Sequence, residues 1–117
     1  MQAEVIRQAK RLALSHPGLS EMADLFSVPN GARVGQREAL KLKAEGMTAG
    51  VADLLLLVPR GGYHGLAIEM KTPSGRVRPE QTDWLIRHER RGYLVAVCRK
   101  VSDAVELLTR YLTQGVS

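Results

Sequence analysis

The chain has 117 residues, of which 44% are hydrophobic and 25% are charged, and its 17 lysines and arginines exceed its 12 acidic residues to give a formal net charge of +5. This length suits a single domain, the single cysteine excludes a disulfide scaffold, and the longest apolar run is far shorter than the roughly 20 residues that span a bilayer. We therefore expect one intracellular domain without membrane association, and the excess of basic side chains favours a polyanionic partner such as nucleic acid.

The first half of the chain predicts two helices around a short strand. Apolar residues at helical spacing indicate an amphipathic helix over 4–15, which ends where Pro17 disfavours further helix. The apolar run 25–28, followed by a Pro-Asn-Gly turn, is typical of a strand. A basic helix is expected over 33–45, with Gly46 just past its C-terminus.

The second half of the chain predicts most of a sheet. The segment 51–58 is apolar on both faces and should form a strand that is buried on both sides. A glycine-rich turn then leads into a returning strand over 65–71. A helix is expected over 79–91, a third strand over 93–98 and a last helix from 102 to about 112. The element order predicts an α/β fold in which helices flank a mixed sheet.

Three charged residues interrupt these apolar strands. Asp53 lies inside the first predicted strand of the hairpin, and Glu69 and Lys71 end the second. A turn centred near Gly61 gives facing residues whose numbers sum to about 122, which places Asp53 opposite Glu69 at a Cβ separation of about 4.5–5.5 Å. Lys71 then projects to the same face as Glu69, and the backbone carbonyl of Met70 lies between them.

Paired carboxylates without histidine or cysteine ligands suit Mg²⁺ or Mn²⁺ better than Zn²⁺. Such a metal can polarise a phosphoryl oxygen and acidify its bound water, and an adjacent lysine can stabilise negative charge that develops on the phosphate. The pattern therefore predicts phosphodiester hydrolysis. The alternative is a structural cross-strand charge cluster, because a Glu-x-Lys triplet also occurs by chance.

An aspartate, a hairpin and then Glu-x-Lys is a pattern that resembles the PD-(D/E)xK nuclease superfamily. More specifically, the chain resembles a stand-alone VRR-NUC domain of the kind encoded by phages and prophages. The matching segments follow in order along nearly the whole chain: Glu4-x-x-x-Gln8, Val28-Pro29-Asn30-Gly31, Lys43-Ala44-Glu45-Gly46, Gly50-Val51-Ala52-Asp53, Gly61-Gly62-Tyr63-His64-Gly65-Leu66, Ile68-Glu69-Met70-Lys71, and Gln81 with Trp84. One departure is Ala52, where the family often has proline.

The resemblance implies a restriction-endonuclease-like core that cleaves DNA with Mg²⁺, for which Mn²⁺ substitutes. The resemblance implies a metal site whose ligands are Asp53, Glu69 and the Met70 carbonyl. The further catalytic residues that it implies are Lys71, Gln81 and Glu4. Stand-alone members resemble Holliday junction resolvases, so a homodimer acting on branched DNA in the bacterial cytoplasm is expected. The symmetry of a four-way junction also favours a homodimer, because two symmetric cuts need two symmetric sites.

Basic residues lie before and after the acidic pair in the sequence, and they predict contacts to DNA phosphates. Such contacts position a duplex without reading its sequence. They are Arg33, Arg37, Lys41 and Lys43 before the first acidic strand, and Arg76 and Arg78 after the second. Aromatic residues make up only 4% of the chain, which disfavours a single-strand binder that depends on base stacking. Two alternatives stay open: a non-catalytic DNA-binding module with the nuclease fold, and an interaction protein with a structural acidic cluster.

Overall fold

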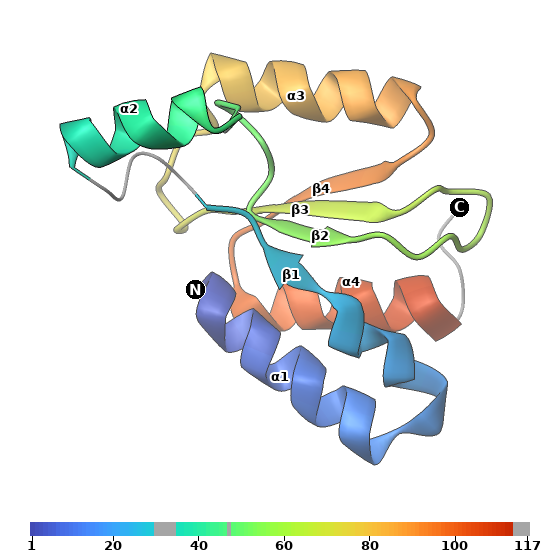
Figure 1. The fold of residues 1–117 in the computed structure, drawn as a ribbon. Helices are drawn as coiled ribbons and strands as arrows, with labels where there is room; N and C mark the ends of the chain where they lie inside the picture. The colour runs from blue at the N-terminus through green and yellow to red at the C-terminus, as the bar shows by residue number, and fades with distance from the viewer. Residues whose placement is uncertain (30–34, 47, 114–117) are drawn as a thin grey trace.

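The computed structural model describes residues 1–29, 35–46 and 48–113 of the chain. Figure 1 shows its elements, which are α1 (Gln2–Ser15), the 3-10 helix η1 (Pro17–Asp24), β1 (Phe26–Ser27), α2 (Gln36–Ala44), β2 (Leu54–Leu56), β3 (Leu66–Met70), α3 (Pro79–Arg90), β4 (Leu94–Cys98) and α4 (Val101–Thr113). Within these described ranges, no helix is both long enough and apolar enough to cross a membrane.

The four strands form one sheet in the order β1-β2-β3-β4. The β1–β2 and β2–β3 pairs are antiparallel, and the β3–β4 pair is parallel. Leu54 faces Ile68 and Leu56 faces Leu66, so the register predicted for the hairpin is confirmed. The α/β class with a mixed sheet flanked by helices is confirmed as well.

The hairpin turn depends on glycine. Arg60 and Tyr63 form an isolated bridge, and the two residues between them, Gly61 and Gly62, have φ angles of 58° and 88°. Two positive φ angles in succession are what a tight two-residue hairpin turn demands, and side chains disfavour them. The bridge is offset by one residue from the β2–β3 ladder, so a local irregularity between turn and strands restores the predicted register.

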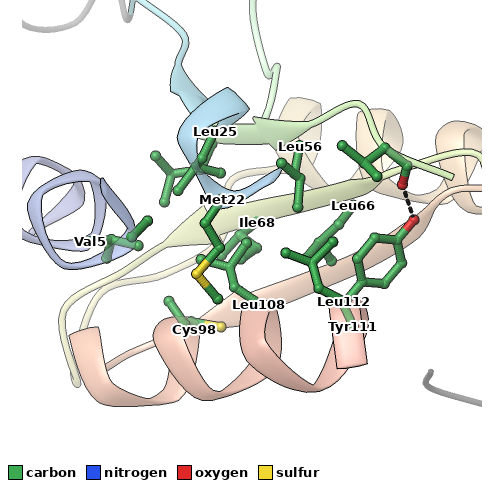
Figure 2. Packing of buried hydrophobic residues seen from close by; sticks show 14 of the residues in the cluster. Val5, Met22, Leu25, Leu56, Leu66, Ile68, Cys98, Leu108, Tyr111 and Leu112 are labelled. Atoms are coloured by element: carbon green, nitrogen blue, oxygen red, sulfur yellow. Dashed lines mark hydrogen bonds between the residues drawn. The ribbon is translucent and has the colours of Figure 1, made fainter. Parts of the chain in front are cut away.

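The larger core lies on the sheet face covered by α1, η1 and α4. Side chains alternate along β2 and β3, so Leu56, Leu66 and Ile68 point into this core. Figure 2 shows them packed against Met22 and Leu108, among others. The hydroxyl of the fully buried Tyr111 donates a hydrogen bond to the Val58 carbonyl at 2.6 Å, which ties α4 to the segment after β2.

The opposite face is covered by α3 and carries a smaller apolar cluster. Its buried members are Ala52, Ala67, Trp84 and Leu85. Trp84 stacks on His88, with ring centroids 3.7 Å apart, along the same helix. Because Glu69 is two residues from Ala67 on β3, its side chain projects to this α3 face.

Some predicted boundaries were wrong. The strand predicted over 51–58 is restricted to Leu54–Leu56, and burial on both sides fails at Leu57, whose side chain is 57% exposed. The physical reason is that α3 packs against β4 and leaves that end of β2 uncovered. The chain after Pro17 forms the helix η1, which the sequence pattern did not indicate.

The other helices and strands differ from the predictions by one to three residues. The start of the basic helix predicted over 33–45 lies partly outside the described residues, and α2 covers Gln36–Ala44. Gly46 follows it with a φ of 103°, as expected for a residue just past a helix C-terminus.

Candidate functional site

Two carboxylates are buried on the α3 face of the sheet. Asp53 directly precedes β2 and is 5% exposed, and Glu69 in β3 is 2% exposed. The β2–β3 register, extended by one residue, places the two side chains opposite each other. Asp53 Oδ2 also accepts a hydrogen bond from the backbone N–H of Met70 at 2.9 Å, which fixes Asp53 against β3.

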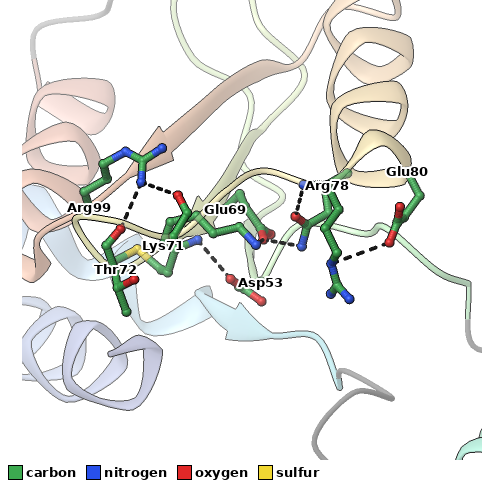
Figure 3. Close-up of polar contacts among 10 residues, drawn as sticks. Asp53, Glu69, Lys71, Thr72, Arg78, Glu80 and Arg99 are labelled. Atoms are coloured by element: carbon green, nitrogen blue, oxygen red, sulfur yellow. Dashed lines mark hydrogen bonds and ion pairs between the residues drawn. The ribbon is translucent and has the colours of Figure 1, made fainter.

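Two further side chains contact Glu69, and Figure 3 labels one of them, Lys71. The Nζ atom of Lys71, the residue after β3, lies 3.3 Å from Glu69 Oε2. Gln81, 3% exposed in the first turn of α3, donates its Nε2 hydrogen to the same Oε2 at 2.6 Å. Gln81 Oε1 accepts from the backbone N–H of Arg78 at 2.9 Å. The Gln81 amide is therefore held at both ends and joins the start of α3 to β3.

The surroundings of Asp53 and Glu69 make the negative charge of this acidic pair unfavourable. Burial, followed by the negative charge of Asp53, raises the pKa of Glu69 from the ordinary 4.5 to about 6. The ammonium of Lys71 opposes both effects. Among the described residues, two facing carboxylates with the Lys71 ammonium beside Glu69 leave an excess of negative charge inside the protein, which is costly unless a further cation is bound.

One carboxylate oxygen is free to accept a further ligand. Glu69 Oε1 is buried and has no hydrogen-bond partner in the part of the chain that the structure describes, while Oε2 contacts Gln81 and Lys71. A buried oxygen without a partner normally destabilises a fold by about 1–3 kcal/mol. Glu69 and Asp53 together could hold a hard divalent cation, which would satisfy this oxygen and offset the repulsion, so the donor set fits Mg²⁺ or Mn²⁺.

The Met70 carbonyl is oriented toward the side of β3 on which Asp53 lies. The N–H and carbonyl of one strand residue point to the same neighbouring strand in an antiparallel pair, and the Met70 N–H points to Asp53. The Met70 side chain is buried in the larger core on the other face. In the described ranges, no third histidine, cysteine or acidic side chain joins Asp53 and Glu69 as a metal-binding group.

Glu4 lies in the first turn of α1 and is engaged within that helix. Its carboxylate pairs with Arg7 and accepts a hydrogen bond from Gln8 Nε2 at 3.1 Å. The hydrogen bond from Arg7, followed by the one from Gln8, lowers the pKa of Glu4. The structure does not bring Glu4 into the cluster of Asp53, Glu69, Lys71 and Gln81, so its part in the site stays a prediction.

The predicted DNA-contact residues that the structure describes are exposed, namely Arg37, Lys41 and Lys43 on α2, and Arg76 and Arg78 in the loop before α3. Arg33 lies outside the described residues. Figure 1 shows α2 and α3 on the same side of the sheet, which is the side that carries the acidic pair. Arg78 Nε lies 3.5 Å from Glu80 Oε1, in an exposed pair that leaves the guanidinium accessible.

One polar residue beside the cluster lies outside the predicted set. Arg99, the residue after β4, donates hydrogen bonds to backbone carbonyls in the loop that follows Lys71. The available signal was its place directly after the third predicted strand. That place becomes informative only when β4 is known to run parallel to β3, because the two strand ends then lie side by side.

Comparisons with known proteins agree with this geometry. A model of the VRR-NUC domain family matches residues 3–102 of the chain. Among solved structures, the chain is similar to one described as a "VRR_NUC domain protein", with a TM-score of 0.75, 26% sequence identity, and coverage of 99% of this chain and 91% of that chain. No curated protein matches the chain.

Proposed function

The chain belongs to the VRR-NUC domain family of nucleases, with its restriction-endonuclease-like fold, and on that premise we propose that it is a metal-dependent endonuclease that hydrolyses phosphodiester bonds in DNA. The observation that carries the proposal is the buried pair of Asp53 and Glu69. Among the described residues, Glu69 Oε1 has no hydrogen-bond partner, and Lys71 Nζ lies 3.3 Å from the other oxygen. A cation site beside a lysine suits cleavage of a phosphodiester, because both positive charges can stabilise the charge that develops on the phosphate.

Each residue of the cluster has a distinct role in this proposal. Asp53, Glu69 and the Met70 carbonyl hold Mg²⁺, for which Mn²⁺ substitutes. When bound, the cation supplies Lewis-acid polarisation of the phosphodiester and neutralises charge on it. Lys71 stabilises the negative charge that develops on the phosphate in the transition state.

Gln81 acts by orienting Glu69. Its amide occupies Oε2 at 2.6 Å and is itself held by the Arg78 backbone N–H. With Oε2 engaged, Glu69 would keep its Oε1 available to help hold the cation. Glu4 is the most exposed acidic residue of the proposed set, and its carboxylate pairs with Arg7. We therefore assign Glu4 to the edge of the site.

DNA binds through phosphates on the basic surface around the cluster. We assign these contacts to Arg33, Arg37, Lys41, Lys43, Arg76 and Arg78. The exposed positions of the five described members support this assignment. A domain of this size covers one arm of a branched substrate, so paired cleavage of a structure such as a Holliday junction would need a homodimer with two symmetric sites.

Cleavage of labelled four-way junction and of plain duplex, each with Mg²⁺, Mn²⁺ or EDTA, tests the proposal. The wild type should cut with either metal and not with EDTA, and should prefer the junction. Lys71→Met should cut about 100- to 1,000-fold more slowly, the usual effect of removing one group that stabilises transition-state charge. Lys100→Met removes the same charge from an exposed residue outside the cluster and should cut at the wild-type rate. If the wild type binds both DNAs and cuts neither, the domain is a non-catalytic binding module.

A further inference from the structure

The loop between β3 and α3 separates the two side chains that hold Glu69. Lys71 begins this loop, and Gln81 follows it in the first turn of α3. The loop turns sharply at its start, where the Gly75 N–H donates to the Thr72 carbonyl at 3.1 Å. Its shape therefore sets where Lys71 stands relative to Glu69 and to the exposed Arg76.

A single guanidinium holds this turn from outside. Arg99 Nη1 donates to the Thr72 carbonyl at 2.9 Å and to the Gly75 carbonyl at 2.7 Å, with the Pro73 carbonyl at 3.4 Å (Figure 3). Hydrogen bonds from a charged donor are stronger than neutral ones. Among the residues that the structure describes, no carboxylate forms an ion pair with Arg99, so the carbonyls are its polar partners there.

The backbone next to Arg99 holds Lys71 as well. The Lys71 N–H donates to the carbonyl of Cys98 at 2.9 Å, and Cys98 ends a strand that pairs with β3 over five residues. The end of β4 thus contacts Lys71 through its backbone and contacts the following turn through the Arg99 side chain. These two attachments leave little freedom in the segment that presents Lys71 Nζ to Glu69.

We propose that Arg99 is a positioning residue for DNA cleavage, which holds the 72–75 turn so that Lys71 stays beside Glu69. This inference rests on the proposed nuclease function. Arg99 touches neither Lys71 Nζ nor the carboxylates in this role and acts through the backbone of the turn. Its removal should therefore slow cleavage while the DNA affinity is retained.

Two variants and a control test the proposal on the full chain with the junction substrate. Arg99→Met keeps the aliphatic part of the side chain and should lower the single-turnover rate by up to about 100-fold, as expected for a reacting group displaced by about 1 Å. Arg99→Lys should give an intermediate rate, because one ammonium can replace part of the contact with the carbonyls. Lys100→Met, which removes the neighbouring charge, should match the wild type. The dissociation constant for DNA should change by less than about twofold in all three.

Trypsin digestion without DNA or metal gives a readout that does not depend on activity. Trypsin cuts after arginine, and Arg76 is followed by Val77, whereas the bond after Arg78 is protected by Pro79. Cleavage at Arg76 should be faster in Arg99→Met than in the wild type, and closer to the wild-type rate in Arg99→Lys. A global loss of stability would instead expose arginines throughout the chain at once.

Three results would overturn the proposal. The first is wild-type rates of DNA cleavage and of trypsin digestion in Arg99→Met. The second is weaker DNA binding in Arg99→Met with a salt dependence reduced by about one phosphate contact, which would make Arg99 a DNA ligand. The third is a wild type that cuts no DNA, which removes the proposed nuclease function itself and is thereby distinguished from the first two.

Discussion

The two faces of the sheet bury different kinds of residue. The face covered by α1, η1 and α4 buries a continuous apolar core, in which the Tyr111 hydroxyl is satisfied by the Val58 carbonyl. The face covered by α3 has a small apolar cluster and the buried polar residues Asp53, Glu69 and Gln81. Apolar burial stabilises the fold on the first face, whereas the second keeps two like charges together at a cost. The apolar residues that stabilise the fold and the polar residues of the candidate site thus lie on opposite faces of one sheet.

The largest effect on stability is expected on the apolar face. Leu108 is fully buried in α4, so Leu108→Ala should lower the free energy of unfolding by about 2–5 kcal/mol, from lost transfer energy and the cavity left behind. Leu57→Ala, at a side chain that is 57% exposed, is the matched control and should change it by less than about 0.5 kcal/mol. Urea denaturation measures both.

DNA cleavage by the folded fraction of Leu108→Ala should equal that of the wild type. If the cleavage rate falls in proportion to the loss of stability, the separation between the two faces fails.

An intermediate effect is expected from pH on the α3 face. The pKa of Glu69 is raised from 4.5 to about 6, so the metal-free folded state holds a proton that the unfolded state has released in this range. Stability should therefore fall as the pH rises from 4.5 to 6, by up to about 2 kcal/mol from this group. Urea denaturation in EDTA at pH 4.5 and 6.5 measures the change.

Glu69→Gln is the control for this pH effect, because glutamine does not titrate. The free energy of unfolding of Glu69→Gln should not show the decrease that Glu69 produces in the wild type between pH 4.5 and 6.5. An identical pH dependence in wild type and Glu69→Gln would show that the carboxylate is not under strain in the folded protein.

The smallest effect is expected where a polar group is satisfied within the apolar face. Tyr111→Phe removes the hydroxyl that donates to the Val58 carbonyl and should cost about 1 kcal/mol, because the carbonyl is left without this donor. Thermal unfolding measures the loss, and DNA cleavage should be unchanged. A stability equal to that of the wild type would mean that water replaces the hydroxyl.

The acidic pair was predictable from the sequence because its position depends on local signals. The glycine turn gives the approximate centre of the hairpin, and the ladder, which is offset by one residue from the bridge at the turn, places Asp53 opposite Glu69. The exposure of Leu57 was not predictable in this way, because apolar periodicity does not reveal which end of a strand a distant helix will cover. The helix η1 was missed because a short 3-10 segment has no lasting periodicity.

Contacts between elements far apart in the sequence were harder to foresee. Gln81 was placed near the site by family resemblance, but its hydrogen bond to Glu69 depends on how α3 packs on the sheet. Arg99 reaches the loop after Lys71 because β4 runs parallel to β3, and no local pattern specifies that pairing.

The central claim is that Asp53 and Glu69 form a divalent-cation site, and Mn²⁺ binding in the absence of DNA tests it most directly. Titration followed by electron paramagnetic resonance should show one bound Mn²⁺ per chain in the wild type, accompanied by a rise in melting temperature, because a ligand that binds the folded state stabilises it. Asp53→Asn and Glu69→Gln should each abolish binding, while Lys100→Met should bind as the wild type does. Equal Mn²⁺ binding by the wild type and both carboxylate variants would contradict the claim.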